Sequence, residues 1–454
     1  MSKTVSIPLL LLLSPPFAPF PPQEPRYAIR FEGGSVTWDE YHLELARRYR
    51  GRPIGRQALD HLVSRVLFQR EAARRGLAKD PEAVASRLAL IESRLKKNGK
   101  KLGPYLRGRG LSRKEFDEYL QLSIWTEEIT RRDMGLEAGA AIRPEMIRLW
   151  VKEAERRQGV VRDPAKLPSQ VCARIGDREI SLVELGRTMD RNLVAKDRRA
   201  VLKQMAAFRL LAREAERRGI RIEAADIEER LAKIAEETAA RPEMKKAGLD
   251  LEALLHAQGR TLEDLKHEDA FLARVYAAKL GGVLFPDEAV RKAFRGERGK
   301  WLDKVGPARL AWRIFLRTGP GRSTEEAKKI LRDLARKIAG IESFRVHARR
   351  FGEGSEARVA KGRLGWLHRA EEGWDPRMLE ALFALRRGEV SAPVEEFGGV
   401  SLLFVSDLRE APPEDRILPE IREFLFRDWL RGRIREARIV FYAKDGRPLP
   451  AEGG

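Results

Sequence analysis

The sequence predicts a multidomain, mainly α-helical protein in which a helical module occurs twice and is followed by a small α+β domain. Two helical blocks carry similar residues in the same order. A stretch that begins at Ala308 alternates apolar and other residues, as a strand does. The chain has 454 residues, which is long enough for two to four domains.

The composition is that of a folded protein. Hydrophobic residues make up 43% of the chain and charged residues 35%, so it can bury real cores and is not a low-complexity polymer. The single cysteine, Cys172, excludes an internal disulfide framework and any multi-cysteine metal site. The six histidines show no close pairing with ligand spacing. We therefore expect neither a metal nor a cofactor.

Lysine and arginine number 89 against 68 acidic residues, which gives a formal net charge of +21. The basic residues are interleaved with acids, as in Arg70 to Arg75, and this pattern is typical of solvated helix faces. No zinc-finger spacing, aromatic RNA-binding strand or Gly-rich phosphate loop is present, so we expect no nucleic-acid partner. The charge would favour acidic clients or an anionic envelope surface.

Residues 1–25 differ from everything that follows. Lys3 precedes the apolar run Ile7–Leu13, and a proline-rich stretch follows up to Pro25. A positive start with a short apolar core is typical of a secretory signal. We therefore expect an exported protein of the periplasm or cell envelope; if the leader is not a signal, the protein is cytoplasmic.

The repeat is clearest in the segments Phe68–Leu77 and Leu211–Ile220, which share a Gln/Ala-Arg-Glu-Ala core and end in Arg-Arg-Gly before an apolar residue. The matches extend outward and place one helical module at 28–150 and a second at 171–285. Between them, residues 151–170 contain Gly159 and two prolines and are predicted to be a linker.

Start and stop signals recur in both copies. Thr37 and Ser181 are each followed three residues later by a glutamate, a pattern that caps a helix N-terminus. Gly76 and Gly219 then lie where a helix would end. The second copy keeps four of five apolar positions of the first long helix, and Arg209 is the exception.

A small α+β domain is predicted at 306–410. Apolar residues alternate from Leu310 to Leu316, a turn follows, and Ser323-x-x-Glu326 opens a helix. Short helices around 344–351 and 379–385 precede a closing strand at 400–405. After this domain, residues 414–443 are predicted to form a C-terminal helix and a last strand.

Three stretches of this domain resemble the parvulin peptidyl-prolyl isomerases: Phe344–Phe351, Lys361–Trp366 and Ala381–Val394. The last contains the family's Phe-Ala-Leu-x-x-Gly-Glu-x-Ser-x-Pro-Val segment unbroken. The order of helical modules, parvulin unit and C-terminal helix resembles the SurA and PrsA chaperones. The resemblance implies a parvulin domain with an antiparallel sheet, and helical modules like the SurA N-terminal region.

The resemblance also implies a site that grips a proline ring while the X-Pro amide rotates, a process that requires no nucleophile or cofactor. The gripping positions correspond to Leu364, Trp374, Met378 and Phe383, all of them apolar. Leu364 and Phe383 would equally suit the core of a small α/β domain, so both interpretations stay open for them. Trp374 and Met378 are the better pocket candidates, because they lie at i and i+4 beside Gly373 and Pro376.

The polar positions depart from the family pattern. Arg313 stands where a typical parvulin has its first histidine, Ser401 stands at the second, and Gly354 falls at the family's Cys or Asp. The candidate catalytic residues are therefore Arg313, Ser401 and Glu353, the neighbour of Gly354. Whether the domain is an active peptidyl-prolyl cis–trans isomerase stays open.

Two hypotheses for function follow. In the first, the protein is an exported folding factor of the SurA/PrsA type that binds unfolded or extended proline-containing polypeptides and catalyses X-Pro isomerisation. In the second, the parvulin fold is a catalytically inactive holdase or peptide-binding scaffold, since a fold does not by itself imply its function.

Overall fold

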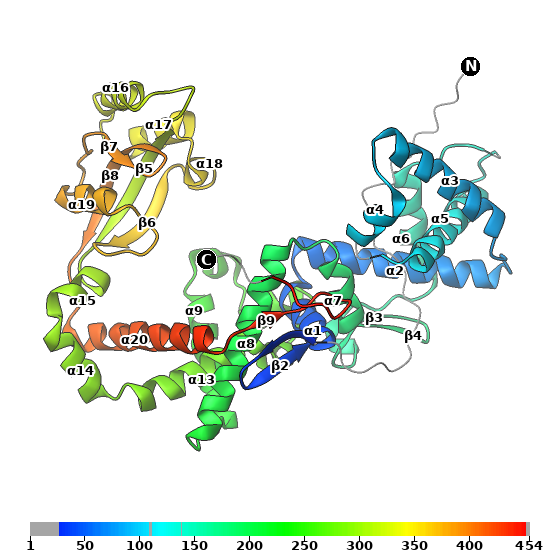
Figure 1. The fold of residues 1–454 in the computed structure, drawn as a ribbon, viewed down its shortest axis with the longest axis horizontal. Helices are drawn as coiled ribbons and strands as arrows, with labels where there is room; N and C mark the ends of the chain where they lie inside the picture. The colour runs from blue at the N-terminus through cyan, green and yellow to red at the C-terminus, as the bar shows by residue number, and fades with distance from the viewer. Residues whose placement is uncertain (1–26, 109–110, 138, 451–454) are drawn as a thin grey trace. The chain divides into compact units, whose positions relative to one another are not determined.

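The computed structural model describes residues 27–450 apart from 109–110 and 138 (Figure 1). The predicted leader at 1–25 lies outside the described residues. The described chain forms two units, one made of residues up to Ala278 together with those from Gly432 onward, and one made of Lys279–Arg431. The chain is mainly helical and multidomain, which confirms the predicted fold class.

The first unit contains copy 1 and all of copy 2 except the end of its last helix. Copy 1 begins with two strands and continues with helices: β1 (Tyr27–Phe31), β2 (Gly34–Thr37), α1 (Trp38–Tyr49), α2 (Pro53–Arg74), α3 (Pro81–Lys97), α4 (Leu102–Gly108), α5 (Arg113–Asp133) and α6 (Pro144–Arg157). Copy 2 has the same opening order: β3 (Val171–Ile175), β4 (Arg178–Ser181), α7 (Leu182–Asp190), α8 (Ala195–Arg217), α9 (Ala224–Ala239), α10 (Pro242–Ala247), α11 (Leu251–Ala257), α12 (Leu262–Lys266) and α13 (Asp269–Leu284).

The two opening hairpins have the same register. In copy 1, Tyr27 pairs with Thr37 and Ile29 with Val36, with a bulge between the two pairs. In copy 2 the bulge recurs at the corresponding place, between Val171 and Ala173. The predicted caps are confirmed, because Thr37 and Ser181 each accept a hydrogen bond from the backbone three residues later. The duplication is therefore visible in the backbone as well as in the sequence.

Each hairpin lies against the long helix of the other copy. A side chain at Gly33, in the first turn, would collide with Arg213 of α8, and one at Gly176, in the second turn, would collide with Arg70 of α2. Arg70 and Arg213 occupy the same position in the repeat. The packing of the two copies is therefore reciprocal.

Glu40 and Glu184, which belong to the N-terminal caps of α1 and α7, also contact the other copy. Arg209 Nη2 lies 2.6 Å from Glu40 Oε1, and Arg65 Nη2 lies 3.8 Å from Glu184 Oε1. Arg209, the polar exception in the apolar pattern of copy 2, thus has a partner in copy 1. The polar substitution is explained by a contact that only the packing of the two copies creates.

One core joins the two copies. Helices α1 and α7 pack closely, and a Cβ at Gly186 of α7 would lie 1.9 Å from the carbonyl oxygen of His42 in α1. The core contains buried residues from both hairpins and from α1, α2, α7 and α8, among them Ile29, Leu45, Leu62, Ile175, Leu185 and Leu202. The predicted modules at 28–150 and 171–285 therefore share a core.

Asp190, at the end of α7, has no exposed surface and holds together three parts of this unit. It accepts a hydrogen bond from Tyr41 Oη at 3.1 Å and pairs with Arg198 Nε and Lys444 Nζ, each at 2.6 Å. Burial alone would raise the pKa of Asp190, but His42, Lys444 and Arg198 hold it far below its ordinary value. Lys444 follows β9 (Val440–Phe441), which pairs with β1.

The second unit begins with a helical part. Helices α14 (Asp287–Gly296), α15 (Arg298–Val305) and α20 (Glu414–Glu436) pack around Val290, Phe294, Trp301 and Ile421. Helices α13 and α20 each run across the boundary between the units. No helix in the described part of the chain is both long and apolar enough to span a membrane.

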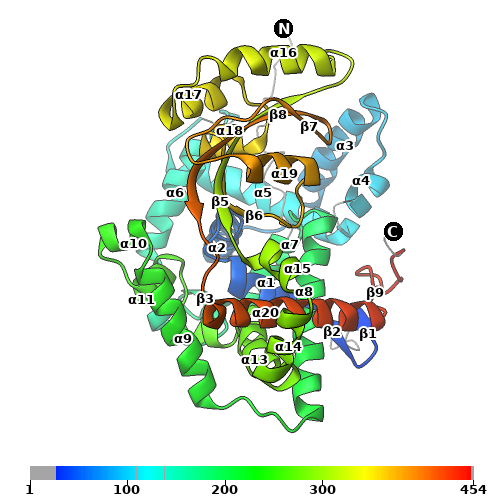
Figure 2. The same ribbon diagram turned by 90° about the vertical axis from the view of Figure 1, so that its left-hand side faces the viewer.

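The rest of the second unit is the predicted α+β domain (Figure 2). Its sheet has the antiparallel order β6-β5-β8-β7, formed by β6 (Arg363–His368), β5 (Ala308–Arg317), β8 (Gly399–Arg409) and β7 (Val394–Glu396). The helices of this domain are α16 (Thr324–Ala335), α17 (Ile341–Phe351), α18 (Ser355–Ala360) and α19 (Pro376–Ala384).

The two faces of this sheet have separate cores. Trp312, Ile314 and Leu316 of β5 pack with α16 and α17 on one face. Ala311 of β5 packs with α19 on the other face, together with Leu403 of β8. The alternation along β5 therefore places Arg313 on the face that α19 covers.

The sequence pattern does not indicate β6. We predicted no strand between the helix at 344–351 and the helix at 379–385, but Arg363–His368 pairs with β5 at the edge of the sheet. Gly365 has φ +104°, and the register shifts between Ala311 and Trp312 of the partner strand. Because the strand is irregular and only partly buried, it lacks the alternation by which strands are recognised.

Candidate functional site

Arg313 lies at the centre of a polar cluster on the α19 face of the sheet. Its Nε donates to Glu356 Oε1 at 2.9 Å, and its Nη1 donates to both carboxylate oxygens of Glu396 at 3.1 Å. The guanidinium carbon also lies 5.0 Å from the ring centroids of both Phe315 and Trp374. The Arg313 side chain is only 13% exposed, so the ion pairs are largely shielded from water.

Ser401 joins the same cluster. It lies on β8 opposite Phe315, has no exposed surface, and donates its hydroxyl hydrogen bond to Glu396. Glu396, at the end of β7, thus accepts hydrogen bonds from Arg313 of β5 and from Ser401 of β8. Two of the three predicted catalytic residues are brought together, with a carboxylate between them.

Glu353 belongs to a different set of contacts. Its Oε2 accepts from the backbone nitrogen of Arg317 and its Oε1 accepts from Arg322 Nη1, both at 2.8 Å. Burial alone would raise the pKa of the Glu353 carboxyl, but these two donors hold it below its ordinary value. The predicted catalytic residue Glu353 is therefore not part of the Arg313 cluster, in which Glu356 is one of the acidic partners.

The four predicted gripping residues belong to one apolar cluster around α19. Met378 has no exposed surface and Phe383 is 9% exposed, whereas Leu364 and Trp374 are partly buried. The guanidinium carbons of Arg309 and Arg369 lie 5.1 and 5.0 Å from the Phe383 ring centroid. In this conformation, Met378 offers no surface to a peptide.

The sequence reasoning missed Glu356 and Glu396. A signal was available, because an arginine at an inward-facing strand position requires acidic partners when it is buried. Glu356 follows Gly354 by two residues, and Glu396 directly precedes the turn into β8. The packing of β7 against β8 decides which acid reaches Arg313, and the sequence alone does not show that packing.

Comparison with known proteins supports the assignment of this domain. The family model of the PPIC-type peptidyl-prolyl isomerase (rotamase) domain matches residues 314–407. Chaperone SurA of Ralstonia nicotianae is 33% identical over 138 residues, which is 28% of this chain and 27% of the relative. Chaperone SurA of Sodalis glossinidius is 27% identical over 191 residues, 38% of this chain and 42% of the relative.

Among solved structures, the peptidylprolyl isomerase PrsA from Bacillus anthracis is 17% identical, with a TM-score of 0.26, over 50% of this chain and 88% of that one. The chain matches only about a quarter to two-fifths of the length of the two SurA relatives. The predicted resemblance is nevertheless confirmed: residues 314–407 match the family model of the PPIC-type (parvulin) rotamase domain, in a chain that is similar to the SurA chaperones.

Proposed function

We propose that the protein is a folding factor that binds unfolded or extended polypeptides, and that its parvulin-type domain serves this binding without catalysing X-Pro isomerisation. The similarity to Chaperone SurA supports the first part of the proposal. The ion pairs of Arg313 with Glu356 and Glu396 carry the second part.

A parvulin-type catalyst must stabilise a twisted amide more than a planar one. At Arg313, two donors of the guanidinium are already bonded to carboxylates, and the positive charge is balanced by two negative charges nearby. Ser401 donates its hydrogen bond to Glu396 and has no exposed surface. These groups therefore have little unbalanced charge to offer a rotating amide.

The apolar residues lead to the same expectation. A proline pocket requires open apolar surface, but Met378 is fully buried and Phe383 is nearly so. Trp374 and Leu364 keep partly exposed surface, and Phe397, in the turn between β7 and β8, is 94% exposed. This surface suits a shallow contact with an extended chain better than a closed pocket around one proline ring.

We also propose that the protein is exported, as the leader indicates, and that its clients need not contain proline. The apolar run Ile7–Leu13 after Lys3 supports export. Fractionation of cells expressing the full chain tests this point. Recovery with the envelope fraction agrees with export, and recovery with the cytoplasm contradicts it.

Suppression of aggregation tests the binding activity. A client unfolded in urea is diluted into buffer with increasing amounts of the full chain, and light scattering is followed. We expect suppression that saturates near a stoichiometric ratio, and equal suppression for a proline-free client, because binding is not tied to the amide. Unchanged scattering with both clients would contradict the proposed function.

A further inference from the structure

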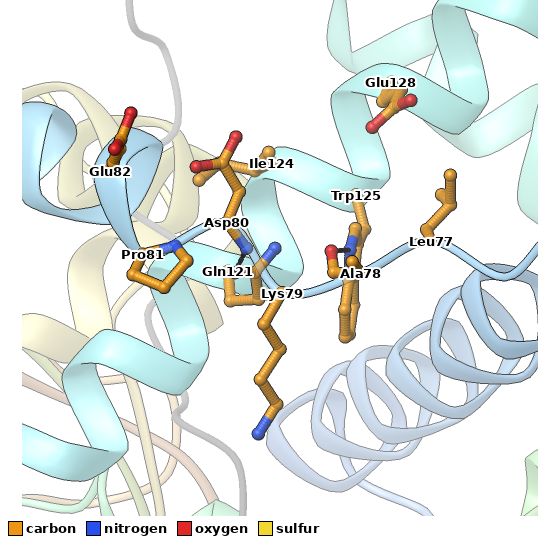
Figure 3. A pocket seen from close by; sticks show the side chains of 10 residues that line it. All are labelled: Leu77, Ala78, Lys79, Asp80, Pro81, Glu82, Gln121, Ile124, Trp125 and Glu128. Carbon is orange, nitrogen blue, oxygen red and sulfur yellow. Dashed lines mark hydrogen bonds between the residues drawn. The ribbon is translucent and has the colours of Figure 1, made fainter.

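A pocket in copy 1 lies between helix α5 and the segment that joins α2 to α3 (Figure 3). Its volume is about 520 Å³, and its lining combines the segment 77–82 with Gln121, Ile124, Trp125 and Glu128 of α5. Residues 77–80 are outside any helix or strand, and the segment is tied to α5 by two hydrogen bonds. Trp125 Nε1 donates to the Ala78 carbonyl oxygen at 3.2 Å, and the Asp80 nitrogen donates to Gln121 Oε1 at 2.7 Å.

The side-chain amide of Gln121 has a hydrogen-bond donor without an acceptor among the described residues. The residue is 6% exposed, and its Oε1 accepts from Asp80, but its Nε2 has no partner among the described residues. A buried amide donor without an acceptor costs free energy. A backbone carbonyl of a bound chain is an acceptor that would remove this cost.

The rest of the lining has two characters. Ile124 and Trp125 are partly exposed and provide apolar and aromatic surface. Asp80 and Glu82 are exposed carboxylates, whereas the carboxylate of Glu128 pairs with Arg132 at 2.6 Å. Even with Lys79 present, the lining carries more negative than positive charge, although the whole chain carries +21.

We propose that this pocket binds an extended polypeptide segment in which a lysine or arginine lies next to an apolar residue. The cationic side chain meets Asp80 and Glu82, its apolar neighbour contacts Ile124 and Trp125, and a backbone carbonyl accepts from Gln121 Nε2. A guanidinium also interacts favourably with the face of a tryptophan. The proposal rests on the proposed function and names one class of client segment for it.

Charge makes the proposal specific. A basic segment is repelled by the net charge of the protein at long range, so its binding requires a local acidic site. An acidic segment is attracted by the protein as a whole but is repelled in this pocket. A preference for basic over acidic segments therefore reflects binding in the pocket and not attraction by the net charge of the protein.

Copy 2 differs at this place. Its α5 counterpart is interrupted, because α12 ends at Lys266 and α13 begins at Asp269. The segment that corresponds to 77–80 is Ile220-Arg-Ile-Glu223, which carries an arginine where copy 1 has Ala78. We therefore expect the site to belong to copy 1.

Fluorescence anisotropy of two labelled twelve-residue peptides on the full chain tests the proposal. One peptide alternates arginine and leucine, and the other has glutamate in place of each arginine. We expect the basic peptide to bind more tightly than the acidic one.

The variant Asp80→Asn/Glu82→Gln removes two carboxylates, and the asparagine it introduces is still able to cap α3. We expect it to weaken binding of the basic peptide by about five- to tenfold.

The matched control is Glu145→Gln/Glu153→Gln, which makes the same change of charge at exposed positions of α6, outside the pocket. It should change the affinity by less than about twofold. Equal affinity of the parent and Asp80→Asn/Glu82→Gln, or tighter binding of the acidic peptide, would overturn the inference. If the parent still suppresses client aggregation in that case, the inference about the pocket is wrong but the proposed function stands. If the parent neither binds peptide nor suppresses aggregation, the proposed function is wrong as well.

Discussion

The two copies of the repeat share their opening hairpins and their long helices and differ in the helices that follow. The hairpins share a register, and the long helices α2 and α8 carry equivalent arginines that meet the turn of the opposite hairpin. Beyond this shared part, copy 1 continues with an unbroken α5 and copy 2 with the separate helices α12 and α13. The reciprocal part holds the unit together, and the outer helices are where the copies have diverged.

The largest expected effect concerns a position where the copies differ inside the shared part. Asp190 of copy 2 corresponds to Ala46 of copy 1. Asp190→Ala removes the acceptor of Tyr41 and the carboxylate partner of Arg198, so we expect the unit to lose about 2–4 kcal/mol of stability. Lys444 is 44% exposed and can turn to water, which limits the loss.

Urea unfolding of the full chain, followed by far-UV circular dichroism, measures this loss. Asp190→Asn is the control, because it keeps an acceptor for Tyr41 while removing the charge, and it should cost less than alanine. A loss below about 1 kcal/mol for Asp190→Ala would mean that this buried cluster does not join the parts of the unit.

The close approach of α1 and α7 gives the next effect. A Cβ at Gly186 would lie 1.9 Å from the backbone oxygen of His42, so Gly186→Ala must separate the helices and should cost about 1–3 kcal/mol. Gly282, inside α13, has open space around it. There, alanine should stabilise by up to about 1 kcal/mol through helix propensity. Thermal unfolding of both variants measures the contrast, and equal behaviour would contradict the close packing of the copies.

The two ion pairs between the copies give the smallest expected effect, and they differ from each other in distance and exposure. The Arg209–Glu40 pair is short at 2.6 Å, but both side chains are about 40% exposed. The Arg65–Glu184 pair is longer at 3.8 Å, but it is 5% and 12% exposed. Since water screens the first pair, we expect a coupling of about 0.5 kcal/mol there and about 1–2 kcal/mol in the second. Double-mutant cycles measure both, and a stronger coupling in the exposed pair would contradict this ranking.

Much of the fold could be predicted because its signals are local. The capping residues, the stop glycines Gly76 and Gly219, and the alternation along β5 depend on neighbouring residues only, and the structure confirms each of them. The reciprocal packing of the copies could not be predicted, since it depends on contacts far apart in the sequence. Arg209 showed only that the apolar pattern was broken, and Glu40 explains why.

The candidate site was predictable in part. The motif before the last strand located the domain, and the pairing of β5 with β8 brings Arg313 and Ser401 to one face of the sheet. Glu396 and Glu356, which balance the charge of Arg313, belong to segments whose positions are set by tertiary packing. Burial of Met378 also depends on how α19 docks, which its apolar character alone does not determine.

The most direct test of the central claim is a protease-coupled X-Pro isomerisation assay on the full chain, with peptides that vary the residue before proline. We predict a rate equal to the uncatalysed rate at protein concentrations that fully suppress client aggregation. We also predict no change for Arg313→Ala, Glu353→Ala or Ser401→Ala. A rate that rises in proportion to protein concentration and falls in Arg313→Ala would contradict these predictions and show that the ion-paired arginine takes part in catalysis.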